Sequence, residues 1–151
     1  MIEIREAIRE DLEDLLELYT HLNDNPMPEI DTRIEEIWDD ITNDKNRHTF
    51  VAVVDDKAAA TLTLFINQSL VRNQRPFALV EYVVTHPDFR GGGIASALLS
   101  VAQKKAKDFN CYKIMLITGQ SSETVHKLYQ NSGYKSQGKT AYVKELEERL
   151  I

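Results

Sequence analysis

The sequence has few of the features that mark several large classes of protein. Its one cysteine, Cys111, cannot form a disulfide within the chain, so we expect a reducing, cytoplasmic location. No apolar run approaches the ~20 residues of a membrane span, and the first residues are unlike a signal peptide, so we expect no membrane association. The 18 basic residues are outnumbered by 24 acidic ones and form no basic tract, which argues against nucleic acid as a partner.

What the sequence does have is the composition of an ordinary folded domain. Hydrophobic residues make up 42% and charged residues 28% of its 151 positions. It contains no repeat and no linker, so we expect one domain over residues 1–151. The four histidines lie at spacings that do not suit metal ligands, so we expect no metal site.

Hydrophobic periodicity predicts an α/β (α+β) arrangement. Alternating or continuous apolar runs predict strands at residues 2–5, 50–54, 58–66, 77–85, 114–117, around 134, and 140–144. Apolar residues at helical spacing predict helices over residues 8–22, 30–41, 94–109 and 123–131. This order predicts a mixed sheet covered by helices on both faces.

The most informative stretch is residues 80–99. A β-branched run is followed by Arg90, the three glycines Gly91 to Gly93, and a helical pattern. Glycine lets backbone N–H groups approach a ligand, and N–H groups at a helix start form an anion site with the positive end of the helix dipole. Arg90 adds a cation. The segment therefore predicts a strand, a diphosphate-binding turn and a helix, in that order.

Two common diphosphate motifs do not fit this stretch. A P-loop needs Gly-Lys-Ser/Thr after the turn, and none follows. A dinucleotide-binding turn needs a third glycine where the sequence has Ser96, and an acid at the end of the next strand, where it has Thr118 and Gly119. The pattern that remains is Arg-x-x-Gly-x-Ala, formed by Arg90, Gly93 and Ala95.

This pattern resembles the coenzyme A pyrophosphate loop of the GNAT superfamily of N-acetyltransferases. A second stretch resembles the family's Phe-Tyr-x-x-x-Gly-Phe motif, whose tyrosine meets the coenzyme A sulfur: Leu128-Tyr129-Gln130-Asn131-Ser132-Gly133-Tyr134. A third is similar to the segment between strand and loop in many members: Glu81-x-Val83-Val84-x-His86-Pro87-x-x-Arg90. The resemblance covers nearly the whole chain and implies a mixed sheet of about seven strands. Within the family, the sequence is most similar in character to small-substrate members such as aminoalkylphosphonate and glucosamine-6-phosphate N-acetyltransferases.

The resemblance implies acetyl-CoA as cosubstrate, with no metal. Backbone groups of Val83 and Val84 would align the pantetheine and polarise the thioester carbonyl, and residues 90–96 would hold the pyrophosphate. Ser122 stands where the family often has an asparagine that contacts pantetheine. The residues expected to bind the coenzyme are Val83, Val84, Thr85, Arg90, Gly91, Gly92, Gly93, Ile94, Ala95, Ser96, Ser122 and Tyr129.

Two side chains are candidates for the proton transfers that acetylation of an amine requires. The Tyr129 phenol, with an ordinary pKa of ~10, is protonated at pH 7 and can serve a leaving thiolate of pKa ~8.5. Glu81 interrupts an apolar strand, where a carboxylate is costly unless it faces a cleft, and is the candidate base, directly or through a water. The alternatives are a core aromatic at 129 and a solvent-facing carboxylate at 81.

The implied function is acetyl-CoA-dependent acetylation of a primary amine of a small molecule, by direct attack on the thioester. The alternatives are a protein acetyltransferase, acting on lysine or an N-terminus, and a non-catalytic acyl-CoA sensor. A homodimer is common in the family, but no residue here decides the oligomeric state. Arg72 and Arg75 are candidates for contacting an anionic group of the acceptor or a partner subunit, and residues 23–30 are expected to border the acceptor site.

Overall fold

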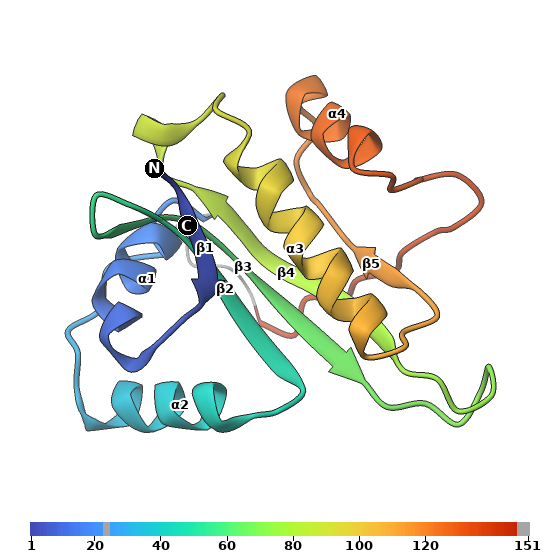
Figure 1. The fold of residues 1–151 in the computed structure, drawn as a ribbon, viewed down its shortest axis with the longest axis horizontal. Helices are drawn as coiled ribbons and strands as arrows, with labels where there is room; N and C mark the ends of the chain where they lie inside the picture. Colours follow the sequence, from blue (N-terminus) through green and yellow to red (C-terminus); the bar gives the residue numbers. More distant parts are fainter. Residues whose placement is uncertain (23–24, 148–151) are drawn as a thin grey trace.

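The sheet and its helices occupy three layers in the computed structural model, which describes residues 1–22 and 25–147 (Figure 1). The strands of the described residues form one sheet in the order β1-β2-β3-β4-β5. Neighbours are antiparallel from β1 to β4, whereas β4 and β5 are parallel. The strands are β1 (Glu3–Glu6), β2 (Arg47–Val54), β3 (Lys57–Asn67), β4 (Phe77–Thr85) and β5 (Ile114–Leu116).

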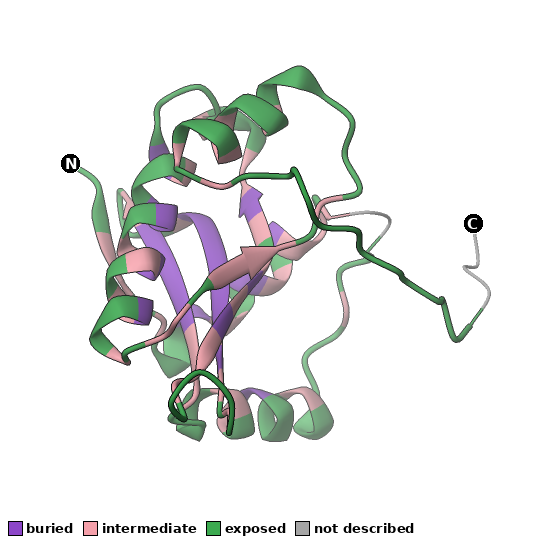
Figure 2. Cartoon of the chain, turned by 90° about the vertical axis from the view of Figure 1, so that its right-hand side faces the viewer, coloured by how far each residue is buried: buried purple, intermediate pink, exposed green. Residues whose placement is uncertain are grey.

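The helices cover both faces of the sheet, as the sequence predicted. They are α1 (Leu12–Tyr19), α2 (Thr32–Asn43), α3 (Ile94–Asp108) and α4 (Glu123–Asn131), with short 3-10 turns at Arg9–Asp11 and Pro87–Phe89. Side chains alternate between the two faces of the sheet along β3. Leu62 and Leu64 pack against α3, and Thr61 and Thr63 lie on the opposite face. The face toward α1 and α2 buries Leu15, Trp38 and Val51. Buried strand residues fill the interior between these layers (Figure 2).

An ion pair fixes the start of α1 to the first strand. Arg5 donates two hydrogen bonds to the Asp11 carboxylate, at 2.6 and 3.1 Å, and the Ile8 amide donates a third at 2.7 Å. Burial alone would raise the pKa of Asp11, but these donors outweigh it and hold that pKa below its ordinary value. The Trp38 indole donates to the Arg9 carbonyl at 3.0 Å, which ties α2 to the same turn.

The C-terminal part of the sequence prediction is wrong in detail. Residues 134–147 contain no strand, so the described chain has five strands and not about seven. Tyr142 and Val143 are 94% and 69% exposed, and the segment runs away from the sheet (Figure 2). A short segment with so few apolar side chains buries too little surface to fix its position by packing alone.

The other boundaries shift by a few residues. The predicted helix over residues 8–22 is a 3-10 turn followed by the shorter α1, and its neighbours 23–24 lie outside the described residues. The strand predicted at 50–54 begins earlier, at Arg47. Within residues 1–22 and 25–147, no helix is both long enough and apolar enough to cross a membrane.

Candidate functional site

Strand β4 carries a bulge at its centre. Between the pairs Thr63–Glu81 and Thr61–Val84, β3 contributes one residue and β4 contributes two, Tyr82 and Val83. Tyr82 has φ +57°, a left-handed conformation that is uncommon for a bulky side chain. A bulge leaves one residue outside the hydrogen-bond ladder, so backbone groups of β4 become available to a ligand here.

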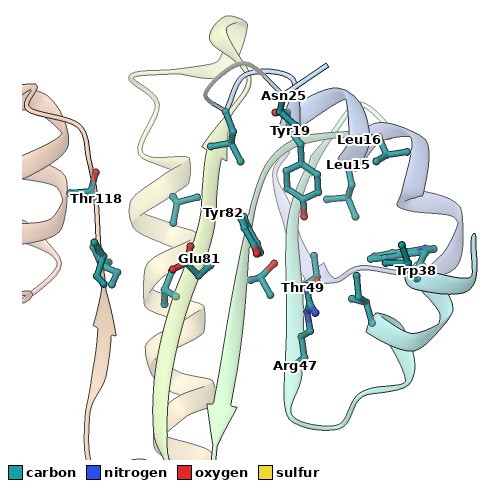
Figure 3. Close-up of a pocket in the computed structure, with 18 of the residues that line it drawn as sticks. Leu15, Leu16, Tyr19, Asn25, Trp38, Arg47, Thr49, Glu81, Tyr82 and Thr118 are labelled. Atoms are coloured by element: carbon teal, nitrogen blue, oxygen red, sulfur yellow. The ribbon is translucent and has the colours of Figure 1, made fainter. Parts of the chain in front are cut away.

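The pairing of β4 with β5 ends just before this bulge. Pairing between β4 and β5 in the described chain covers three positions, from Ala78–Ile114 to Val80–Leu116. Beyond them the two parallel strands separate, and a cavity of about 730 Å³ lies at the opening (Figure 3). The bulge and the splayed strands therefore form one feature, at which both the backbone and the side chains of β4 become accessible.

The cavity has two sides of different construction. The first, which we call the β4–β5 side, consists of residues 80–83, residues 116–120 and Tyr129 of α4. The second, which we call the α1–α2 side, consists of residues from α1, from the segment that follows α1, and from α2, β2 and β3. These are Leu12, Leu15, Leu16, Tyr19, Leu22, Asn25, Ile34, Ile37, Trp38, Ile41, Arg47, Thr49 and Thr63.

Glu81 lies between these two sides. It is half-buried, and its pairing with Thr63 places it on the sheet face that α1 and α2 cover. Glu81 and Tyr82 project from β4 between Thr118 and the α1–α2 side (Figure 3). The Tyr82 ring contacts that of Tyr19 edge-on, with centroids 6.1 Å apart. A carboxylate is thus held at the junction of the two halves of the cavity.

Tyr19 supplies a buried phenol to the α1–α2 side. Burial raises the pKa of this phenol, and the effect exceeds the opposing influences of Thr63 and the Arg47 cation. Tyr19 therefore remains a neutral hydrogen-bonding group throughout the neutral pH range.

Tyr129 is positioned by the way α4 begins and ends. The Ser122 hydroxyl accepts a hydrogen bond from the Val125 amide at 3.2 Å and caps the first turn. At the other end Gly133 adopts φ +93°, and the Tyr134 amide donates to the Tyr129 carbonyl at 3.0 Å. This turn brings the Tyr134 ring against Tyr129, with centroids 6.2 Å apart. Burial raises the pKa of Tyr129, so its hydroxyl keeps its proton at neutral pH.

The glycine turn joins the end of β4 to α3. Gly91 and Gly93 have φ +83° and +79°, and Gly93 is the N-cap of the 15-residue α3. The Arg90 guanidinium donates from Nε to the Thr85 carbonyl at 3.0 Å, which ties the turn back to the strand. Because the first N–H groups of a helix have no partner within it, the turn presents backbone donors beside a cation.

The structure brings some of the predicted site residues together and separates others. Glu81, Val83 and Tyr129 line the same cavity. Val84 is buried, and neither it nor Thr85 is part of the cavity lining. The remaining predicted residues also lie outside the lining, either in the glycine turn and the first turn of α3 or at the cap of α4: Arg90, Gly91, Gly92, Gly93, Ile94, Ala95, Ser96 and Ser122.

The loop arginines lie outside the cavity lining. Arg75 donates to the carbonyls of Asn110 and Cys111 at 3.1 and 3.2 Å, and the Arg72 guanidinium lies 5.6 Å from the centroid of the Tyr112 ring. These contacts hold the loop before β4 against the turn before β5, and they give neither arginine a place among the cavity residues.

The α1–α2 side contains functional candidates that the sequence analysis missed. Tyr19 and Trp38 lie within the predicted helices, where apolar spacing alone marks no function, and Arg47 and Thr49 lie outside the strand predicted at 50–54. The signal that could have revealed Arg47 and Thr49 is a strand that begins at residue 47, because residues 47 and 49 of such a strand lie on one face. In the part of the chain that the structure describes, no group of three or more His, Cys, Asp or Glu residues could hold a metal ion.

Comparisons with known proteins agree on one family. A family model described as "Acetyltransferase (GNAT) family" matches residues 10–134. An acetyltransferase from Pectobacterium atrosepticum is 40% identical over 55 residues, a stretch spanning 36% of this chain and 39% of that relative. A solved structure from Agrobacterium tumefaciens, described as a candidate acetyltransferase, is 34% identical, covers 95% of this chain and 99% of its own, and has a TM-score of 0.86. Glucosamine-6-phosphate N-acetyltransferase from Arabidopsis thaliana, 20% identical with 97% and 99% coverage and a TM-score of 0.86, shares the fold.

Proposed function

Because this chain belongs to the acetyltransferase (GNAT) family and is an N-acetyltransferase, we propose that it moves an acetyl group from acetyl-CoA to the primary amine of a small molecule. One observation carries the proposal: a carboxylate, the bulge of a strand and a protonated phenol line one cavity, at Glu81, Val83 and Tyr129. These are the groups that amine deprotonation, carbonyl polarisation and thiolate protonation require.

The residues present suit acetyl-CoA. The left-handed conformations of Gly91 and Gly93 let the backbone of the turn curve around an anion, and a Cβ at either position would meet no atom within 4 Å, so the space beside the turn is open. Residues 90–96 would hold the pyrophosphate. The pantetheine would then run from this turn along the edge of Val83 and Val84 that β5 leaves unpaired, into the opening between β4 and β5.

Each group of the chain has one task in the reaction. When bound, acetyl-CoA supplies a thioester whose carbonyl carbon bonds to the amine nitrogen while its carbon–sulfur bond breaks. Glu81 accepts the proton that the amine loses, directly or through a water. The backbone N–H of Val83 would stabilise the negative charge that develops on the thioester carbonyl oxygen. Tyr129 donates its hydroxyl proton to the departing sulfur, so that protons and charges balance.

The form of the cavity supports a small acceptor over a protein. Its volume of about 730 Å³ is typical of small-molecule sites, and helices α1 and α2 enclose the side opposite β5. A lysine or N-terminus on a protein would have to enter as the end of a long chain, for which an extended surface groove is the usual geometry.

A thiol-release assay tests the proposal. Purified protein and acetyl-CoA are mixed with amino sugars, amino acids, aminoalkylphosphonates, polyamines and a lysine peptide, and free coenzyme A is measured over time. We expect release with at least one small amine, together with the acetylated product by mass spectrometry. Turnover of the lysine peptide alone would replace the small acceptor with a protein, and tight acetyl-CoA binding without turnover of any amine would refute the proposal.

A further inference from the structure

Arg47 is a cation without an acceptor inside the cavity. Among the ion pairs of the described residues none involves Arg47, and its Nε is buried without a hydrogen-bond partner. Its guanidinium lies over the Phe65 ring, 4.7 Å from the centroid, a contact that orients the group but satisfies none of its N–H donors. Because Arg47 lines the cavity and no described residue accepts a hydrogen bond from its side chain, its terminal N–H groups are open to an acceptor that a ligand provides.

The other arginines near the core differ in this respect. Arg5 binds the Asp11 carboxylate, and Arg75 and Arg90 donate to backbone carbonyls. Glu6, on the neighbouring strand β1, contacts His48, whose ring packs against Phe109 at the end of α3, on the opposite face. Arg47 is therefore half-buried and lines the cavity, and it forms no ion pair with an acid among the described residues.

The sheet register relates Arg47 to the proposed base. Thr49 pairs with Thr63, and Thr63 pairs with Glu81, so a straight line across three strands links Thr49 to Glu81. Arg47 lies two residues before Thr49 on the same face, which puts the Cα atoms of Arg47 and Glu81 roughly 12 Å apart from ordinary strand spacings. The Arg47 side chain runs toward Thr49 and so shortens that span (Figure 3).

We propose that Arg47 binds an anionic group of the acceptor, so that the preferred substrates are small amines that also carry a carboxylate or a phosphate-type group. This inference rests on the proposed function, because Glu81 must meet the amine end of the same molecule. The guanidinium fork matches the paired oxygens of a carboxylate, phosphate or phosphonate. The Tyr19 hydroxyl and the Thr49 side chain lie in the same lining and supply further donors to such a group.

Matched pairs of amines test the inference. Each pair differs in the anionic group: β-alanine and β-alaninamide, aminoethylphosphonate and ethanolamine, glucosamine-6-phosphate and glucosamine. We expect the wild-type kcat/KM to favour the anionic member in at least one pair, and the pairs distinguish a carboxylate from a phosphate-type ligand. Arg47→Gln should lower kcat/KM for that anionic amine about 10- to 100-fold, the usual worth of a hydrogen bond to a charged group, and leave its neutral partner within about twofold.

Three further measurements keep the outcome decisive. Arg47→Lys keeps the charge but loses the fork, and should recover part of the lost activity. Arg33→Gln, an exposed arginine on α2, should change neither member of a pair. Calorimetric binding of the anionic amine to wild type and Arg47→Gln reports on the site without turnover, so it still tests Arg47 if the proposed function fails. Equal kcat/KM within every pair, or an Arg47→Gln variant that keeps the wild-type preference, would overturn the inference and leave the acetyltransferase proposal intact.

Discussion

The β4–β5 side and the α1–α2 side of the cavity are built from different parts of the chain. The β4–β5 side, continued by the glycine turn, offers backbone groups: a bulge at Tyr82 and Val83, and two left-handed glycines. The α1–α2 side offers side chains from four separate elements, including Tyr19, Trp38 and Arg47. One half of the site is thus shaped by local conformation and the other by packing.

This difference matches the different tasks of the two halves. A ligand that is the same for every member of a family can be held by backbone geometry, which depends on a few glycines and one irregular strand. An acceptor that differs between enzymes is matched by side chains, which can change without disturbing the sheet. Substitutions on the β4–β5 side should therefore affect the chemistry or the coenzyme, and those on the α1–α2 side the acceptor.

The largest expected effect belongs to Tyr129. Tyr129→Phe removes only the hydroxyl, so the ring contact with Tyr134 persists while proton donation is lost. We expect kcat to fall about 100- to 1000-fold, the range for a general acid, and the acetyl-CoA Kd to stay within about twofold. Since burial raises the pKa of Tyr129, this group should produce no loss of wild-type rate between pH 7 and about 9.

Tyr134→Phe is the matched control for Tyr129→Phe, because it removes a hydroxyl from the ring that packs against Tyr129 and lies outside the cavity lining. An unchanged kcat in Tyr129→Phe would remove the acid role. A rise in the Kd for acetyl-CoA equal to the fall in rate would make Tyr129 a binding group.

Glu81→Gln should have the next largest effect. The amide keeps the shape of the side chain but cannot accept a proton, so kcat should fall about 100-fold, the lower end of the range for general acid–base catalysis. Initial rates at saturating acetyl-CoA and acceptor give kcat, and the acetyl-CoA Kd, which should stay within about twofold, is the control for an intact coenzyme site. A variant that kept the wild-type kcat would exclude Glu81 as the base and assign the proton to another acceptor.

The sequence predicted the backbone-built half of the site better than the other half. Glycine and arginine before a helical pattern predict a turn that opens a helix, and the structure has that turn, with Gly93 as the N-cap of α3; anion binding by the turn stays a prediction. The bulge carried no such mark, because nothing about a tyrosine at position 82 signals a left-handed backbone. Tertiary pairing imposes that conformation: the chain must fit two residues of β4 opposite one of β3.

The fold shows the same division between local and long-range causes. Helices and strands with strong periodicity were confirmed, with boundaries moved by a few residues at α1, α2 and β2. The short strands predicted around 134 and at 140–144 were wrong for the described chain, because brief alternation does not specify a partner strand. Arg47 was missed for a related reason: its role arises from facing a cavity whose other members come from distant segments.

Gly93→Ala should have a moderate effect, on the β4–β5 side. At φ +79° an alanine is strained by about 1 to 2 kcal/mol, so the free energy of unfolding should fall by that amount and acetyl-CoA should bind several-fold more weakly. Gly92→Ala is the matched control, since Gly92 lacks a left-handed φ and its Cβ would meet the Phe89 carbonyl at an ordinary 3.8 Å. Denaturant titration of both variants makes the comparison, and equal stability losses would show that the left-handed conformation is not what the turn requires.

The smallest effect is expected from Asp11→Asn, in the 3-10 turn that leads into α1 and so outside the cavity lining. The pKa of Asp11 is lower in the folded protein than in the unfolded chain, so its carboxylate stabilises the fold above the ordinary pKa of about 4, and that stability is lost as the pH falls through the lower folded-state pKa. At pH 7 the variant should lose about 1 kcal/mol, because Arg5 is partly exposed and solvent screens the pair, and the difference from wild type should shrink as the pH falls through the lowered pKa of Asp11. Since this pair anchors the start of α1, the acceptor KM should rise while the acetyl-CoA Kd stays constant.

Asp39→Asn, at the more exposed pair with Arg9, is the control and should change neither the free energy of unfolding nor the acceptor KM. A pH-independent stability difference would show that Asp11 acts through packing and not through its charge.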